Sequence, residues 1–413
     1  MNNNTMRISV GGCLSVLACA SALYVNAARA ATETILYSFC LGGDDCSDGA
    51  YPAAPLTDVN GTLFGTTAFG GTANDDGTVF ALDPETGKET VLHAFLGGAD
   101  GEAPLGGLID VNGTLYGTTY YGANAGCADT CGTVFALDPE TGKETVLHAF
   151  AGRSRTDGGN PAAGLLQVDG KLYGTTEIGG GSGCGPPGCG TVFALDLRTG
   201  KEKVLYAFTG GQGGAYPIAS LINMGDTLYG TTVQGGIGCS GSGGCGTLFA
   251  VDRKTGKETL LYSFAGGADG AAPSANVVDV NGTLYGTTEL GGSTGCDEGA
   301  GCGAVFAFNL KTGKETVVYA FTGAPGDGAF PLAGLIDVKG SLYGTTMGGG
   351  DICEGTGCGT VFALNLKTNK ETVLFSVQSF PDAGLIKDAS GNFYGTTSAG
   401  GGEGYGTVFS FKR

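Results

Sequence analysis

The stretch Gly77–Phe95, GTVFALDPETGKETVLHAF, decides the fold because it recurs letter for letter at Gly132–Phe150. Looser copies begin at Gly190, Gly246, Gly303 and Gly359. In each copy two β-branched and aromatic runs flank a turn of the type DPETGK, so each copy predicts a β-hairpin. Pro84 presets φ for this turn, and Gly87 suits the left-handed position before the second strand.

A seventh copy is divided between the two ends of the chain. Its first half, GTVFSFKR, is Gly406–Arg413, and its second half, ETILYSF, is Glu33–Phe39. Since the two halves complete one hairpin, we expect the N-terminal strand to join the C-terminal blade and close a ring.

A second marker gives the repeat period. The tetrapeptide YGTT or FGTT recurs every 51 to 58 residues, starting at Phe64, Tyr116, Tyr173, Tyr229, Tyr285, Tyr343 and Tyr394. Each period holds four strand-like segments, which in the second unit are Gly107–Val111, Thr114–Thr119 and the two strands of the hairpin. Units of this size resemble kelch repeats of about 50 residues. The pattern predicts an all-β fold, a seven-bladed β-propeller of four-stranded blades that spans residues 31–413 as one domain.

The connections between segments differ in kind. Tight turns such as Asn60-Gly61 join segments one and two, and the DPETGK turn joins segments three and four. Long, Gly-rich connections lead from segment two to three and from segment four to the next unit. In a propeller the tight turns lie on one face, here called the turn face, and the long connections lie on the other, the loop face. Binding residues in rigid scaffolds usually lie on variable loops, so we expect the site on the loop face.

The N-terminus has the features of a secretory signal peptide over residues 1–30. Arg7 supplies the positive region, Ile8–Tyr24 is largely apolar, and Ala28-Arg29-Ala30 forms a cleavage site. A lipoprotein signal ending at Cys19 is the alternative, although Leu17 fits that pattern poorly. No other apolar run has membrane-spanning length. The sequence therefore predicts a secreted, extracellular or cell-surface protein, with the periplasm as a further location.

The charge limits the partners. The net charge is −18, which argues against nucleic acid and anionic lipid surfaces. It is compatible with a neutral glycan or another protein as ligand. We expect the protein itself to be a monomer.

Twelve cysteines beyond the leader form six close couples. They are Cys40/Cys46, Cys127/Cys131, Cys184/Cys189, Cys239/Cys245, Cys296/Cys302 and Cys353/Cys358. In an exported protein these couples predict six local disulfides on the loop face, each contributing about 2 kcal/mol in the chain-entropy model. Zinc binding is the alternative, but each couple lacks the second Cys or His pair of a zinc site, so we predict no metal.

Few residues carry catalytic chemistry. His93 and His148 occupy a repeat position where other units have Tyr or Phe, which indicates aromatic packing. An Asp-Gly…Pro pattern recurs in the loops that lead into a new unit, at Asp48, Asp100, Asp157, Asp269 and Asp327. These carboxylates could bind calcium, but a turn with an Asx hydrogen bond explains them better. We predict no catalytic residue and no cofactor.

A ligand site should show where the repeat departs from its own pattern. The residue directly after GTT differs from unit to unit and includes Tyr120, Glu177 and Glu289. With Tyr121 and Gln234, these are the candidate ligand-binding residues, and Glu177 and Glu289 could act as a carboxylate pair. The alternative is that they are ordinary solvated loop residues.

The whole pattern, GLIDVNGTLYGTT…GG…GTVFALDPETGKETVLHAF, resembles the GloVer tandem repeat of bacterial choice-of-anchor proteins. The resemblance implies a secreted or surface-displayed bacterial protein and supplies no established activity. From the residues, the preferred function is an exported, non-catalytic binding module that recognises glycan or protein ligands through the loop face. A secreted glycan-active hydrolase or lyase is the alternative, since other propellers host such chemistry, and a structural envelope protein is a third possibility.

Overall fold

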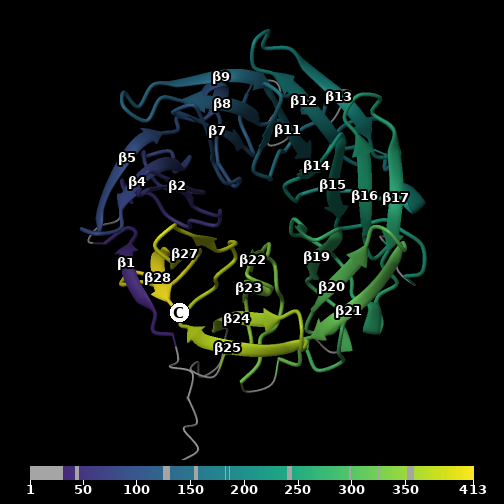
Figure 1. The fold of residues 1–413 in the computed structure, drawn as a ribbon. Coiled ribbons are helices and arrows are strands. Elements are labelled where there is room, and N and C mark those ends of the chain that lie inside the picture. Colours follow the sequence, from purple (N-terminus) through teal and green to yellow (C-terminus); the bar gives the residue numbers. More distant parts are fainter. Residues whose placement is uncertain are drawn as a thin grey trace, which may run out of the picture. The chain divides into compact units, whose positions relative to one another are not determined.

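The computed structural model describes residues 31–41, 46–123, 131–152, 157–181, 183–185, 187–239, 244–296, 299–323, 326–350 and 358–413. The predicted signal peptide, residues 1–30, lies outside the described residues, as do Cys127 and Cys353. Residues Ala31–Arg413 form one compact unit. Within the described part of this unit, seven sheets of four antiparallel strands stand around a ring (Figure 1). The predicted all-β, seven-bladed propeller is confirmed.

Each blade runs from a short innermost strand to a longer outermost one. Blade 1 consists of β2 (Thr57–Val59), β3 (Thr62–Thr67), β4 (Thr78–Asp83) and β5 (Lys88–Ala94). Blade 2 consists of β6 (Ile109–Val111), β7 (Thr114–Thr119), β8 (Thr133–Leu137) and β9 (Glu144–Ala149). Blade 3 consists of β10 (Leu166–Val168), β11 (Lys171–Thr176), β12 (Thr191–Asp196) and β13 (Glu202–Ala207). Blade 4 consists of β14 (Ile222–Met224), β15 (Thr227–Thr232), β16 (Thr247–Asp252) and β17 (Glu258–Ser263).

The remaining blades follow the same order. Blade 5 consists of β18 (Val278–Val280), β19 (Thr283–Thr288), β20 (Ala304–Asn309) and β21 (Lys314–Ala320). Blade 6 consists of β22 (Ile336–Val338), β23 (Ser341–Thr346), β24 (Gly359–Asn365) and β25 (Lys370–Val377). Blade 7 consists of β26 (Ile386–Lys387), β27 (Asn392–Thr397), β28 (Thr407–Lys412) and β1 (Thr34–Ser38). Single 3₁₀ turns lie in three of the loops between blades: η1 (Gly98–Asp100), η3 (Gly211–Gly213) and η4 (Gly267–Asp269).

The two ends of the chain close the ring as predicted. Strand β1 pairs antiparallel with β28, so that Thr34 lies opposite Ser410 and Ser38 opposite Thr407. The Phe39 N–H extends this pairing by donating to the Gly406 carbonyl at 3.0 Å. In Figure 1 the purple strand β1 lies beside the yellow strand β28.

The tight turns have the backbone geometry that the sequence indicates. Asn60 and Gly61 have φ of 54° and 87°, as a type I′ hairpin turn requires, and Asp58 Oδ1 accepts the Gly61 N–H at 2.8 Å. In the DPETGK turn, Asp83 Oδ1 accepts the Glu85 N–H at 2.8 Å and Gly87 has φ of 69°.

Aromatic rings fill the space between neighbouring blades. Phe95 of the loop after β5 packs edge-on against Phe135 of β8, with ring centroids 5.3 Å apart, and both side chains are fully buried. The same contact recurs at other interfaces: Phe39–Phe80, Phe150–Phe193, Phe208–Phe249, Phe264–Phe306 and Phe321–Phe362. The glycine of the YGTT tetrapeptide makes room for the ring, since a Cβ on Gly65 would lie 2.4 Å from Phe80 Cζ.

Threonine hydroxyls join adjacent blades near the axis. The first Thr of GTT donates to a carbonyl of the following blade, as Thr118 does to Ala163 at 3.1 Å. Thr396 does the same to Ala54 at 3.2 Å and so joins blade 7 to blade 1. Among the described residues, no helix is long and apolar enough to cross a membrane.

Candidate functional site

Disulfides hold the connections of the loop face. Four predicted couples are bonded, with Cα–Cα distances of 4.4 Å (Cys40–Cys46), 5.4 Å (Cys184–Cys189), 5.7 Å (Cys239–Cys245) and 5.0 Å (Cys296–Cys302) in the described part of the chain. Cys131 and Cys358 are also disulfide-bonded, and their predicted partners lie outside the described residues.

The disulfides Cys184–Cys189, Cys239–Cys245 and Cys296–Cys302 pack under the neighbouring long loop of the same blade. Cys184 and Cys189 belong to a hydrophobic cluster with Phe208, and a Cβ on Gly210 would lie 2.7 Å from Cys184 Sγ. In blades 3, 4 and 5 the two long connections are therefore fixed to each other, which gives this part of the loop face a defined shape.

Three of the five predicted site residues lie together on this face. The Tyr120 hydroxyl of blade 2 donates to Glu177 Oε2 of blade 3. The Tyr120 and Tyr121 rings lie 4.7 Å apart, edge to face. Burial, reinforced by the Glu177 carboxylate, raises the pKa of the Tyr120 hydroxyl. Tyr120 therefore stays a neutral hydrogen-bond donor, and the pair forms a polar corner between two blades.

The other two predicted residues lie on the following blades. The backbone of Gln234 in blade 4 bridges to Ala215, and the Glu289 N–H in blade 5 donates to the Ala272 carbonyl at 3.1 Å. Glu177 and Glu289 belong to blades 3 and 5, which are not neighbours, and Val233 occupies the equivalent position between them. The two carboxylates could therefore act as a pair only on a ligand that spans blade 4.

An aromatic pocket on the loop face was missed in the sequence. Tyr51, Phe69 and Tyr405 line a cavity of about 610 Å³ between blades 7 and 1, here called the seam pocket, beside the Cys40–Cys46 disulfide. The Tyr51 ring contacts Phe69 at 5.5 Å and Tyr405 at 5.9 Å between centroids. Tyr51 is 38% exposed and Phe69 is 44% exposed, so both rings offer apolar surface to a ligand.

The repeat did contain a signal for this pocket. Tyr405 precedes the GTVF motif at the position where five other units carry a cysteine. Phe69 is the second residue after GTT, whereas most candidate residues were taken from the position directly after GTT. Tyr51 and Tyr405 are also 354 residues apart and meet only because the ring closes.

A central cavity of about 270 Å³ is lined by the segments that precede the innermost strands. Its lining is mostly Ala, Gly and Leu, with Asp382 as the acidic member. Ser398 Oγ donates to Asp382 Oδ2 at 2.5 Å, and burial raises the pKa of this carboxyl. Asp382 Oδ1 is buried without a partner among the described residues.

The sequence pattern assigns the chain to a family. The model of the Gloeobacter/Verrucomicrobia repeat matches residues 21–242 and 239–413. The chain belongs to the Gloeobacter/Verrucomicrobia repeat family. This assignment confirms the resemblance that the repeat motifs indicate. No curated protein sequence matches this repeat protein.

Solved structures with the same architecture are distant in sequence. An oligogalacturonate lyase in complex with manganese has a TM-score of 0.55 and 12% identity, with 94% of each chain covered. The oligogalacturonate lyase of Vibrio parahaemolyticus has a TM-score of 0.50 and 12% identity, covering 94% of this chain and 95% of that one. The extracellular domain of a proposed one-component system of B. thetaiotaomicron has a TM-score of 0.57 and 12% identity, covering 91% of this chain and 40% of that one. At these identities the repeat protein shares the propeller fold with them.

The two histidines and the Asp-Gly loops have a common structural role. His93 Nε2 lies 3.2 Å from Asp100 Oδ2, and its ring packs on Phe95 at 4.8 Å. At the equivalent position of blade 4, the Tyr262 hydroxyl donates to Asp269 Oδ1 at 2.6 Å. The aspartates also accept backbone N–H groups, as Asp100 Oδ2 does from Leu96 at 2.9 Å. The aspartates therefore have a structural role, but Leu96 and its equivalents precede the aspartates in the chain, so these bonds are not the Asx turn that the sequence pattern suggested. The described residues contain no group of three His, Cys, Asp or Glu placed to hold a metal ion.

Proposed function

We propose that this repeat protein is an exported, non-catalytic binding module that recognises a glycan or protein ligand through its loop face. The observation that carries the proposal is the seam pocket, where Tyr51 and Phe69 expose aromatic surface in a cavity of about 610 Å³. Aromatic faces stack on sugar rings and on apolar side chains, so such a pocket suits either ligand class.

The fixed loops support this proposal. Disulfides are typical of exported proteins, and a loop that is already ordered loses little conformational entropy when a ligand binds. The Tyr120–Glu177 corner, with Tyr121, offers hydrogen bonds at a second place on the same face. Gln234 of blade 4 and Glu289 of blade 5 are proposed as further contacts on the same face.

Binding to a large panel of glycans tests the proposal, combined with a depolymerisation assay on the same polysaccharides. The protein is residues 31–413, and the first variant is Tyr51→Ala with Phe69→Ala. Blade 2 carries Ala103 where blade 1 has Tyr51, with φ of 53°, so the alanine fits the local backbone. We expect the double variant to bind at least ~10-fold more weakly, since two ring contacts are lost, and to keep its melting temperature.

Three further variants locate the ligand on the face. Tyr120→Ala and Glu289→Gln should weaken binding, whereas Glu140→Gln, in a turn of the opposite face, should leave it unchanged. An equal loss with Glu140→Gln would show that the loop face is not the site. Cleavage of any polysaccharide by the unaltered protein would replace the binding function by the glycan-active alternative.

A further inference from the structure

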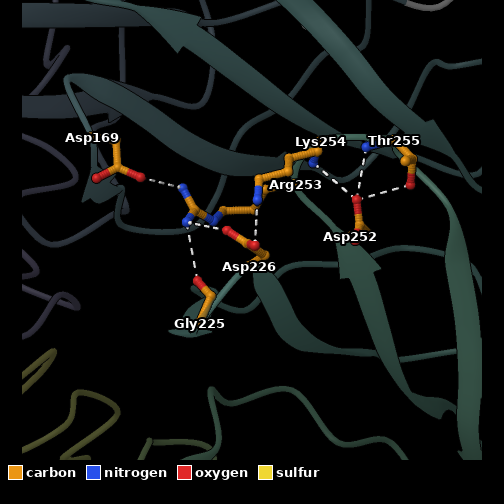
Figure 2. Close-up of polar contacts among 7 residues, drawn as sticks. All are labelled: Asp169, Gly225, Asp226, Asp252, Arg253, Lys254 and Thr255. Atoms are coloured by element: carbon orange, nitrogen blue, oxygen red, sulfur yellow. Dashed lines mark hydrogen bonds and ion pairs between the residues drawn. The ribbon is translucent and has the colours of Figure 1, made fainter.

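The turn face carries a basic cleft between blades 3 and 4 that the proposed function does not use. Five basic residues line it: Lys171, Lys201, Lys203, Arg253 and Lys254. Its volume is about 390 Å³, and Tyr173, Ala194 and Leu205 form its apolar part. Figure 2 shows the polar contacts at its edge, around Arg253.

Three of these basic residues depart from the repeat. Lys171 occupies the position of Thr62, Thr114, Thr227 and Thr283 in other blades. Lys203 occupies the position of Thr90, Thr145, Thr259, Thr316 and Thr372. Arg253 occupies the position of Pro84, Pro139, Leu197, Leu310 and Leu366. A structural demand shared by all blades cannot explain three separate changes to a positive charge in one cleft.

The strand register brings the two new lysines to the same side of blade 3. Lys171 lies opposite Asp196, and two residues further Tyr173 lies opposite Ala194, which in turn lies opposite Lys203. Because residues two apart on a strand share a face, Lys171, Tyr173 and Lys203 all lie on the side that lines the cleft.

Arg253 closes the other side of the cleft from blade 4. Its side chain is 9% exposed and lies over the Tyr173 ring, with Cζ 5.8 Å from the centroid. Nη1 donates to Asp169 Oδ2 at 3.0 Å, and Nη2 donates to the Gly225 carbonyl at 3.0 Å and to Asp226 Oδ1 at 3.4 Å (Figure 2). Arg253 therefore fixes the wall of the cleft across two blades.

The acids of the cleft are already engaged. Asp169 pairs with Arg253, Asp226 pairs with Arg253 and Lys254, and Asp196 accepts the N–H groups of Arg198 and Thr199 in its own turn. In the part of the chain that the structure describes, the ammonium groups of Lys171, Lys201 and Lys203 have no hydrogen-bonded or ion-paired side chain. With five basic and three acidic residues in its lining, the cleft has an excess of positive charge on a protein with a net charge of −18.

The corresponding cleft between blades 7 and 1 has the opposite character. It is lined by Asp58, Asp83, Glu85 and Asp388 and by no basic side chain among the described residues. We propose that the basic cleft is a second ligand site, which binds a ligand bearing closely spaced oxyanion groups such as carboxylates, sulfates or phosphates. Lysines bind such groups as point charges, so the charge and spacing of the oxyanions set the affinity more than their geometry.

Calorimetric titration of residues 31–413 tests the site with three probes: inorganic pyrophosphate, trigalacturonate and a disulfated disaccharide. The test variant is Lys171→Thr with Lys203→Thr, which restores the residue that other blades carry. The control is Lys314→Thr with Lys370→Thr, which removes the same charge from blades 5 and 6. A third variant, Arg253→Leu, introduces the leucine that blades 3, 5 and 6 carry at this position. It tests whether the arginine that fixes the wall of the cleft contributes to binding.

We expect at least one probe to bind, with an affinity that falls as salt screens the charges. The Lys171/Lys203 variant should bind it at least ~10-fold more weakly, the control should bind it as the unaltered protein does, and Arg253→Leu should lie between them. Binding of pyrophosphate alone would identify a phosphate site. Binding of trigalacturonate or the disulfated disaccharide alone would identify an acidic-glycan site. Failure of all three probes to bind, or an equal loss in the control, would overturn the proposal.

Discussion

At the scale of single residues, the second threonine of GTT makes the same side-chain hydrogen bond in most blades. Its hydroxyl pairs with the threonine that begins the third strand, as Thr67 Oγ1 and Thr78 Oγ1 do at 2.8 Å. The pair is fully buried, and because Thr67 Oγ1 donates to the Phe69 carbonyl at 2.9 Å, the Thr78 hydroxyl donates to Thr67 Oγ1, so both protons are bonded without water. Blade 5 departs from this rule, because Ala304 replaces the partner and leaves Thr288 Oγ1 buried with no partner among the described residues.

Ala304→Thr should therefore stabilise the protein. The new hydroxyl would restore the pair that other blades have, and satisfying a buried hydroxyl contributes about 1 kcal/mol to the free energy of unfolding. Denaturant unfolding measures the change, and Ala304→Val provides the control because it adds similar volume without a hydroxyl. If valine stabilised the protein as much as threonine, cavity filling and not the hydrogen bond would be the cause.

At the scale of strands, each outermost strand places a glutamate against the preceding blade. Burial raises the pKa of five of these carboxyls to about 7: Glu89, Glu144, Glu202, Glu315 and Glu371. A neighbouring aspartate adds to the shift, as Asp48 does for Glu89, whereas His148 opposes it for Glu202. Glu33 and Glu258, at the same position, also have raised pKa values.

These glutamates should make the propeller more stable in mild acid than at alkaline pH. Their pKa lies near 7 in the folded chain and near 4.5 in the unfolded chain, so the folded state holds the protons more tightly. Their contribution is fully present below about pH 4.5 and is lost as the pH rises through 7. The turn aspartates, such as Asp83 and Asp138, have lowered pKa values. They stabilise the folded state at higher pH and lose this stabilisation only as the pH falls through their lowered pKa values.

Calorimetry between pH 4.5 and 8.5 measures the effect. Since these glutamates are only partly buried and solvent screens their carboxyls, we expect the melting temperature at pH 8.5 to be at least ~3 °C lower than at pH 4.5. Glu144→Gln with Glu315→Gln should flatten the profile by stabilising the alkaline end. A profile equally steep in that variant would assign the pH dependence to other groups.

The sequence predicted the strands and hairpins because their signals are local. The turn residues Asn60-Gly61 and Asp83–Gly87 set the geometry within a few residues, and the structure confirms them. The first segment of blade 2 is shorter than predicted, because only Ile109–Val111 pair with β7, whereas Gly107 and Leu108 precede the pairing and line the central cavity.

The sites were harder to predict because they form between blades. Tyr120 and Glu177 were chosen separately as departures from the repeat, and only the structure shows the hydrogen bond between them. The seam pocket needs ring closure to bring Tyr51 to Tyr405. The basic cleft lies on the turn face, where the short, repeated turns gave no reason to expect a ligand, and its lysines meet through the strand register and the packing of blade 4 on blade 3.

At the scale of the whole molecule, the last half-hairpin decides whether the ring is closed. Strand β1 covers the edge of β28, and Phe39, which is fully buried, packs against Phe80 of blade 1 at 5.1 Å. The first segment of the described chain thus completes blade 7 and also forms its interface with blade 1. Without it, β28 would present unpaired N–H and C=O groups and Phe80 would lose its partner.

Deletion of residues 31–39 should therefore destabilise the entire ring instead of fraying one blade. Loss of a buried phenylalanine alone costs about 3–5 kcal/mol, which corresponds to a fall in melting temperature of roughly 5 °C for a domain of this size. Phe39→Ala removes the interface contact but keeps the strand, so it should lie between the deletion and the intact chain. Differential scanning calorimetry of residues 31–413, of residues 40–413 and of the Phe39 variant gives the comparison. If the deletion left the main cooperative transition at the same temperature, contacts between consecutive blades alone would stabilise the protein, and ring closure would contribute no stability.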